Sequence, residues 1–209
     1  ANALQQLGIQ PGDRVGTLAW NSDRHLALYF GVSGSGAVLH TVNPRLFPEQ
    51  IDYIVNHAED QVMFFDVTFA PLVARLAPLF KTVRHFVAMT DRATMPTHAI
   101  PNLLCWQDLI DAQSTDFDWP ELDERTASSL CYTSGTTGNP KGVMYSHRST
   151  YMHSMMVTST ANVALAETDR MLVIVPMFHA NAWGVPYAAW MIGADLVFPQ
   201  QYLQAAPLS

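Results

Sequence analysis

Cysteine and charge are both scarce in this sequence. The only cysteines among the 209 residues are Cys105 and Cys131, which excludes a disulfide framework and a cysteine-based zinc site and fits a reducing compartment. Charged residues make up 14% of the chain, and 18 acidic against 11 basic side chains give a net charge of −7. General nucleic-acid binding usually requires the opposite balance, so it is not expected. With 49% hydrophobic residues, the chain is predicted to fold, and neither disorder nor a coiled coil is expected.

Two segments of the sequence are relevant to whether the protein is secreted or spans a membrane. Residues 1–16 lack a cationic start followed by an apolar core, so no signal peptide is predicted. Residues 171–194 are apolar enough to span a bilayer, but Pro176 and Pro186 divide them into short pieces. A buried strand, a loop and a core helix explain this stretch better than a transmembrane helix. We therefore expect a globular, cytoplasmic protein with no transmembrane segment.

Neither end of the sequence has the features of a complete domain. The chain begins with Ala1, and Ala3, Leu4 and Leu7 have the spacing of the last turn of a helix. Residues 200–209 contain no helix cap or closing element. The sequence is therefore predicted to be a piece of a larger protein.

Apolar runs alternate with amphipathic segments through most of the chain. Buried strands are predicted at residues 14–20, 38–42, 61–65, 82–88 and 127–132. Helices are predicted at residues 23–36, with Asp23 as the cap, 48–58 and 69–80. Strands that alternate with helices indicate parallel βαβ units, so the predicted fold is α/β and layered.

The chain is predicted to have two parts separated by an acidic connector. Residues 1–110 would form a first α/β subdomain, and residues 127–209 would belong to a second. Residues 111–126 between them carry six carboxylates with no regular ligand spacing and no nearby histidine. This segment is therefore interpreted as a solvated connector and not as a metal site.

The most informative segment follows the strand predicted at residues 127–132. Residues 133–142, TSGTTGNPKG, contain three glycines, four hydroxyl side chains and Lys141. Glycines allow backbone N–H groups to turn inward and form an anion-binding concavity, and a lysine supplies a mobile positive charge. The pattern therefore predicts a polyphosphate-binding loop.

The loop differs from two common motifs. It departs from the common P-loop because Pro140 stands where the second glycine is required. It also departs from a nucleophile elbow because Tyr132, and not glycine, precedes Ser134 by two positions. Two rivals from other classes stay open: a binding module that has lost catalysis, and a serine hydrolase that uses Ser134. A plain glycine-rich surface turn is the remaining structural alternative.

Residues 132–142, YTSGTTGNPKG, resemble the phosphate-binding signature of the adenylate-forming superfamily, which includes acyl-CoA synthetases, luciferases and amino-acid adenylation domains. The resemblance continues through residues 143–149 and covers essentially the whole chain. It extends upstream to PGDRV at residues 11–15 and NPRL at residues 43–46, and downstream to VPMFH at residues 175–179. The sequence is most similar to medium- and long-chain fatty-acyl-CoA ligases and their methylmercaptopropionate-using relatives.

This resemblance implies a two-step ligase reaction that uses ATP, Mg²⁺ and CoA. A carboxylate attacks the α-phosphate of ATP to give acyl-AMP and pyrophosphate, and the CoA thiol then displaces AMP. The residues that the resemblance assigns to the β/γ-phosphate cradle are Thr133, Ser134, Gly135, Thr136, Thr137, Gly138 and Lys141. Thr136 is the position where the family has a hydroxyl near Mg²⁺. Thr136, Lys141 and His179 are the catalytic candidates.

The downstream motif predicts part of the acyl pocket. A lone histidine in an apolar run is usually a packed core residue, but the motif match assigns His179 to the carboxylate side of the pocket. Trp183 is similar to the aromatic gate of long-chain members, and a core tryptophan is the alternative.

The resemblance also implies that more than half of the family's chain is absent from this sequence. The parent protein is therefore predicted to be an acid–thiol ligase, and the 209-residue chain alone is predicted to be inactive. Aryl-acid and luciferase-like ligases are the nearer alternatives within the superfamily. The sequence leaves open the length of the acyl chain and the oligomeric state, a homodimer included.

Overall fold

A computed structural model describes residues 1–133 and 139–202 of the chain. Nine strands occur in the described residues: β1 (Arg14–Leu18), β2 (Val38–Thr41), β3 (Val62–Phe65), β4 (His85–Ala88), β5 (Leu103–Cys105), β6 (Ala127–Thr133), β7 (Lys141–Ser146), β8 (Arg170–Leu172) and β9 (Asp195–Val197). Eight α-helices occur there: α1 (Asn2–Gln6), α2 (Asp23–Gly34), α3 (Pro48–Ala58), α4 (Ala70–Leu76), α5 (Trp106–Asp111), α6 (His147–Thr158), α7 (Ala180–Trp183) and α8 (Val185–Ile192).

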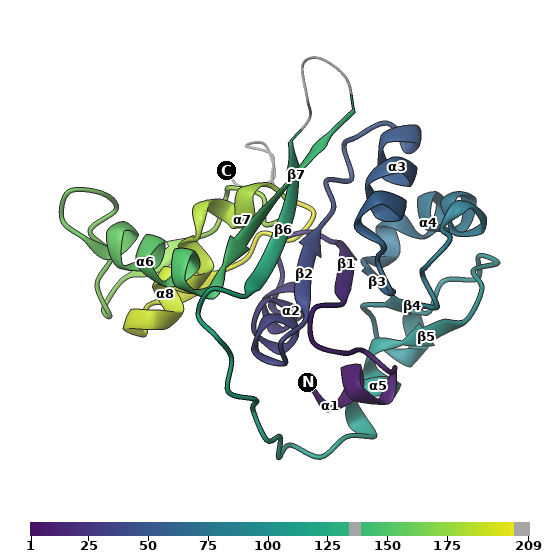
Figure 1. The fold of residues 1–209 in the computed structure, drawn as a ribbon, viewed down its shortest axis with the longest axis horizontal. Helices are drawn as coiled ribbons and strands as arrows, with labels where there is room; N and C mark the ends of the chain where they lie inside the picture. Colours follow the sequence, from purple (N-terminus) through teal and green to yellow (C-terminus); the bar gives the residue numbers. More distant parts are fainter. Residues whose placement is uncertain (134–138, 203–209) are drawn as a thin grey trace.

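The centre of the molecule is a seven-stranded sheet with the order β5-β4-β3-β1-β2-β6-β7 (Figure 1). Every neighbouring pair from β5 to β6 is parallel, and β7 returns antiparallel to β6. Strands β8 and β9 form a separate parallel pair. The predicted layered α/β fold is therefore confirmed, with one antiparallel edge strand that the βαβ pattern did not predict.

Helices cover both faces of this sheet, and each face has its own hydrophobic cluster. On one face, side chains of α1, α2 and α5, among them Leu4, Leu28 and Leu109, pack together with the sheet. On the other face, α3 and α4 contribute Ile54 and Val73. The parallel strands between them are buried on both sides, which is why they are near-continuous apolar runs in the sequence.

Element boundaries agree with the sequence prediction most closely at α3, which spans the predicted residues. The helix predicted at residues 69–80 is shorter, and α4 ends at Leu76, two residues before Pro78, which has no N–H to donate to a helical hydrogen bond. It is replaced at both ends by 3-10 turns, at Val67–Phe69 and Ala77–Leu79. At the start of α2 the cap is Ser22, and not Asp23 as predicted, since the Ser22 hydroxyl accepts the His25 N–H at 3.2 Å.

The acidic connector runs around one end of the molecule before the chain enters β6 (Figure 1). Trp119 in this connector packs against Gly34 of α2 so closely that a Cβ there would lie 2.7 Å from the indole ring. The strands on the two sides of the connector belong to one sheet. The division of the chain into two subdomains at residues 111–126 stays a prediction.

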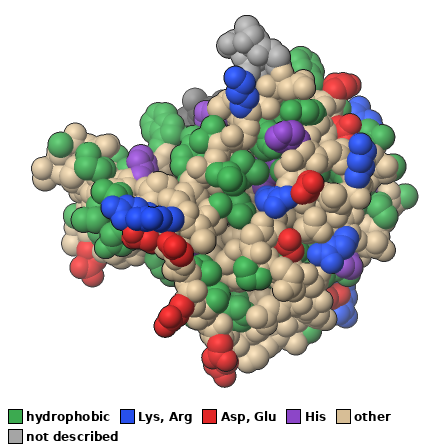
Figure 2. All heavy atoms as spheres, in the orientation of Figure 1, with side chains coloured by type: hydrophobic (Ala, Val, Ile, Leu, Met, Phe, Trp, Pro, Cys, Tyr) green, Lys and Arg blue, Asp and Glu red, His purple; other side chains and the backbone are tan. Residues whose placement is uncertain are grey.

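The segment of α6 and α8 forms a lobe beside the sheet, and hydrophobic side chains gather on its surface (Figures 1 and 2). The large exposed apolar side chains of these two helices are Tyr151, Met152, Met155, Met156, Trp190 and Met191. In the apolar stretch from residue 171 to 194, the structure has β8, α7 and α8 in succession. None of the helices in the described residues combines the length and the apolar character that a membrane crossing requires.

Candidate active site

The predicted phosphate-binding loop covers the chain segment between the antiparallel strands β6 and β7. Ser134, Gly135, Thr136, Thr137 and Gly138 lie outside the described residues. The last residue of β6, Thr133, and the first residue of β7, Lys141, are directly opposite each other in the ladder, and the Thr133 hydroxyl donates to the Lys141 carbonyl at 3.4 Å. Gly142 is paired as well, so both Lys141 and Gly142 belong to a strand and not to the loop as predicted.

The base of the hairpin is held by a half-buried tyrosine. The Tyr132 hydroxyl forms a hydrogen bond with Nδ1 of His57 in α3 at 2.6 Å, and its ring lies 5.2 Å from that of His40 in β2. Burial, with a smaller effect from the Asp60 carboxylate, raises the pKa of Tyr132 to about 12. The phenol therefore stays protonated at neutral pH, and its hydrogen bond with His57 is one of a neutral hydroxyl. The strand that leads into the predicted loop is thus fixed to α3.

Residues Phe178 and His179 of the predicted acyl motif point in different directions. Phe178 is buried, with its ring 6.0 Å from that of Trp20 and 5.5 Å from the Arg45 guanidinium carbon. The cation lies over the aromatic face, which is an attractive arrangement. His179 is exposed and precedes α7. The histidine is therefore not a packed core residue, which was the structural alternative for it.

Helix α7 is a left-handed turn. Ala180, Asn181, Ala182 and Trp183 have φ angles of 45°, 50°, 50° and 56°, and Gly184 continues the series at 70°. For Ala180, Ala182 and Trp183 this backbone costs about 1–2 kcal/mol each, whereas asparagine tolerates it better. At Gly184 a Cβ would lie 2.5 Å from the His153 ring, so glycine is required there both by conformation and by space.

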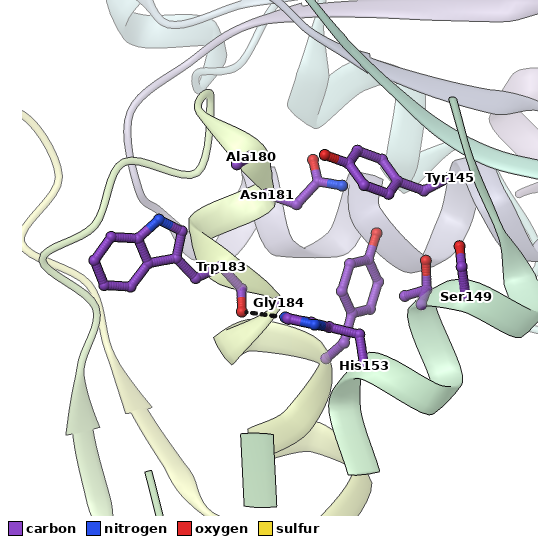
Figure 3. Close-up of a pocket in the computed structure, with 9 residues that line it drawn as sticks. Tyr145, Ser149, His153, Ala180, Asn181, Trp183 and Gly184 are labelled. Atoms are coloured by element: carbon purple, nitrogen blue, oxygen red, sulfur yellow. Dashed lines mark hydrogen bonds between the residues drawn. The ribbon is translucent and has the colours of Figure 1, made fainter. Parts of the chain in front are cut away.

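Two contacts hold this strained turn. Nε2 of His153 in α6 donates to the Trp183 carbonyl at 2.9 Å (Figure 3). Asn181 is buried, and its Nδ2 donates to the Ser129 hydroxyl at 2.8 Å while its Oδ1 accepts from the Cys131 thiol at 3.3 Å. Because Ser129 and Cys131 belong to β6, the turn is connected directly to the strand that leads to the predicted phosphate loop. Strained backbone of this kind persists where surrounding contacts determine it, and it is common at functional sites.

A pocket of about 380 Å³ lies between this turn, β7, α6 and α8. Figure 3 shows the Asn181 amide beside the Tyr145 hydroxyl, whereas the Trp183 indole points away from His153. The Trp183 side chain is 63% exposed. The residues that line the pocket are Tyr145, Ser149, Thr150, His153, Ala180, Asn181, Trp183, Gly184 and Tyr187.

The structure brings some of the predicted site residues together and leaves others apart. Among the described residues that line the pocket, Trp183 is present and His179 is absent. Sequence reasoning missed Asn181, although a lone amide in an apolar run signals a buried hydrogen-bonding role. It also missed Ser149 and His153, whose spacing of four residues places them on one face of α6.

Comparison with known proteins identifies the family. Residues 1–208 match the model of the AMP-binding enzyme family, so the chain belongs to that family, as the phosphate-loop signature predicts. The chain is 54% identical over 198 residues to the 3-methylmercaptopropionyl-CoA ligase of Ruegeria lacuscaerulensis. The aligned residues cover 95% of this chain and 37% of that protein. It is 51% identical over 209 residues to the medium-chain-fatty-acid–CoA ligase of Ectopseudomonas oleovorans. Here the aligned residues cover 100% of this chain and 38% of that protein.

These relatives are acid–thiol ligases by name, and the chain spans less than two-fifths of their length. Among solved structures, the anthranilate CoA ligase AuaEII in complex with anthranoyl-AMP is similar with a TM-score of 0.83 and 27% identity. That likeness covers 95% of this chain and 37% of AuaEII.

Proposed function

We propose that this protein is part of an AMP-forming acyl-CoA ligase that activates a medium- or long-chain fatty acid, or a related acid, with ATP and then transfers the acyl group to CoA. The observation that carries the proposal is the β6–β7 hairpin, which presents Thr133 and Lys141 at facing positions in a chain of the AMP-binding enzyme family. The 209-residue chain alone is proposed to be inactive.

The chemistry at the base of the hairpin fits a polyphosphate. Lys141 is exposed, and none of the described carboxylates lies within ion-pair distance of its ammonium group. The Lys141 ammonium group would provide the positive charge and the hydrogen-bond donors that phosphate oxygens need. Mg²⁺ would offset the remaining phosphate charge, and Thr136 is the hydroxyl proposed to lie near it. The residues proposed to hold the β/γ-phosphates are Thr133, Ser134, Gly135, Thr136, Thr137, Gly138 and Lys141.

The acid is proposed to bind on the side of the left-handed turn. An apolar pocket with a few polar groups suits a hydrocarbon tail that ends in a carboxylate. The exposed imidazole of His179 would orient the carboxylate, and Trp183 would lie between the ATP side and the hydrocarbon. Medium-chain fatty acids and 3-methylmercaptopropionate are the substrate types in the names of the two relatives, which supports an aliphatic acid over other classes.

An aryl acid is the alternative that a specific observation favours, because the fold is similar to that of an anthranilate CoA ligase. The identity to that enzyme is 27%, about half of the identity to the aliphatic-acid ligases. The two rivals from other classes, a non-catalytic nucleotide-binding module and a serine hydrolase that uses Ser134, remain as outcomes of the test. Cytoplasmic location and a homodimer stay predictions.

The test is pyrophosphate release from ATP by the full-length protein with short, medium, long and aromatic acids. The matched variants are Lys141→Ala and Lys81→Ala, because these are the two lysines of the chain and Lys81 lies away from the hairpin, beside α3. We expect release that requires an acid and Mg²⁺, is lost in Lys141→Ala and is retained in Lys81→Ala. The preferred acid would identify the substrate class.

Other results would contradict the proposal. ATP binding without release for any acid would identify a nucleotide-binding module. Labelling of Ser134 by a fluorophosphonate, with hydrolysis that needs no ATP, would identify a serine hydrolase.

A further inference from the structure

The segment at residues 173–178, which leads to His179, contains neither a helix nor a strand. Its backbone nevertheless enters the core, because Val173 and Met177 are buried. Buried carbonyl and N–H groups without a ladder need other partners, since leaving them unpaired is costly. Most of the partners come from a part of the chain about 150 residues away.

The principal partner is Asn21, which is fully buried in the turn between β1 and α2. Its Nδ2 donates to the carbonyls of Val173 and Val175 at 2.7 and 2.8 Å, and its Oδ1 accepts the Met177 N–H at 2.7 Å. The two backbone carbonyls and the one backbone N–H determine the orientation of the Asn21 amide. In the opposite orientation the Asn21 NH₂ group would face the Met177 N–H, and its oxygen would face the two carbonyls. One side chain therefore satisfies three backbone groups of the segment.

A second partner holds the same segment from α2. The hydroxyl of the fully buried Tyr29 donates to the Met177 carbonyl at 2.5 Å, so both polar backbone groups of Met177 are bound by side chains. The next residue, Phe178, is enclosed by Trp20 and Arg45. The position of His179 is thus determined by the two residues immediately before it.

We propose that Asn21, supported by Tyr29, is a positioning residue for the carboxylic acid: it places residues 173–178 so that His179 and the left-handed turn face the substrate. This inference rests on the proposed function. Asn21 contacts neither the β6–β7 hairpin nor its base through any hydrogen bond of the described residues. Its effect should therefore fall on the acid and not on ATP.

The main test variant is Asn21→Asp, which keeps the size of the side chain. A carboxylate cannot donate to the Val173 and Val175 carbonyls and would repel them, so the segment should move. The matched control is Asn56→Asp. Asn56 also donates to backbone carbonyls and accepts a backbone N–H, from Lys81, but it belongs to α3 and its partners lie away from residues 173–178.

Two measurements keep the proposal separate from the proposed function. Hydrogen exchange needs no activity, and the Met177 amide should exchange about tenfold or more faster in Asn21→Asp, but not in Asn56→Asp. In the full-length enzyme, Asn21→Asp should raise the KM for the acid about tenfold or more, with the KM for ATP unchanged. If Asn21→Asp does not fold, Tyr29→Phe is the variant to use, and it should show smaller changes of the same kind.

The outcomes distinguish the two ideas. If no acid supports pyrophosphate release by the wild type, the proposed function fails and the positioning role fails with it, even if the exchange result identifies a structural contact. The positioning role alone fails in two cases in which the enzyme is active. In the first, Asn21→Asp or Tyr29→Phe raises the KM values for ATP and for the acid equally. In the second, the variant behaves as Asn56→Asp does, and in both cases Asn21 has only a structural role.

Discussion

The left-handed turn at α7 allows a prediction in which the size of a substitution effect depends on backbone conformation. Ala182 in the turn has φ of 50°, whereas Ala188 in α8 has right-handed helical backbone. Both side chains are fully buried. Replacing either alanine by glycine therefore removes the same buried methyl group and adds the same freedom to the unfolded chain.

The expected losses of stability follow from the contributions that both variants share and from the backbone strain that only Ala182→Gly relieves. In Ala188→Gly, the helix-interior glycine costs about 1 kcal/mol and the lost methyl burial about 0.8 kcal/mol, so the free energy of unfolding should fall by about 2 kcal/mol. In Ala182→Gly, similar losses are offset by about 1–2 kcal/mol of relieved left-handed strain, which leaves a net loss of about 0–1 kcal/mol. The difference between the variants, about 1–2 kcal/mol, isolates the strain.

Urea denaturation followed by circular dichroism measures this difference, provided that the m values of the variants agree. Ala189→Gly, at another fully buried position of α8, gives the spread of the ordinary helical cost. Equal losses of stability in Ala182→Gly and the two helical variants would refute the reasoning that the turn stores strain.

Two further predictions concern pH. Burial raises the pKa of Asp66 from 3.8 to about 6, so the folded state binds more protons between these values and stability should fall as pH rises through this window, by at most about 3 kcal/mol. Asp66→Asn, which keeps an acceptor for the Trp20 backbone N–H, should remove this contribution, which is measured as the difference from the wild type in urea titrations from about pH 4 to 7. Burial lowers the pKa of His25 from 6.5 to about 4, so here the unfolded state binds the proton first and stability should fall by about 3 kcal/mol as pH decreases from 6.5 to about 4. NMR titration of the His25 ring checks the second prediction.

The two slopes oppose each other, which provides a control. In the Asp66→Asn variant the loss of stability in acid should be steeper than in the wild type, because the compensating group is gone. An unchanged acid slope in that variant, or a His25 ring that titrates near 6.5, would contradict the assigned burial effects.

The predicted elements agree with the structure where local chemistry is decisive. Helix α3 was predicted to the residue because Pro48 starts it and its apolar spacing defines one buried face. Local patterns failed at β7, because alternation and apolar content do not specify whether a strand returns antiparallel to its neighbour. Lys141 was therefore assigned to a loop, although pairing with Thr133 makes it the first residue of a strand.

The candidate site divides in the same way. Neighbouring residues were enough to predict the family, which the comparison with known proteins confirms. The phosphate-binding loop and the role of His179 were inferred from neighbouring residues as well, and both stay predictions. The role of Asn21, the connection of Asn181 to β6 and the left-handed turn depended on the tertiary structure. Asn21 contacts residues more than 150 positions away, and the turn adopts a backbone that its alanines and tryptophan disfavour. Such features arise only when packing brings distant groups together, and a local sequence pattern has no information about which distant groups will meet.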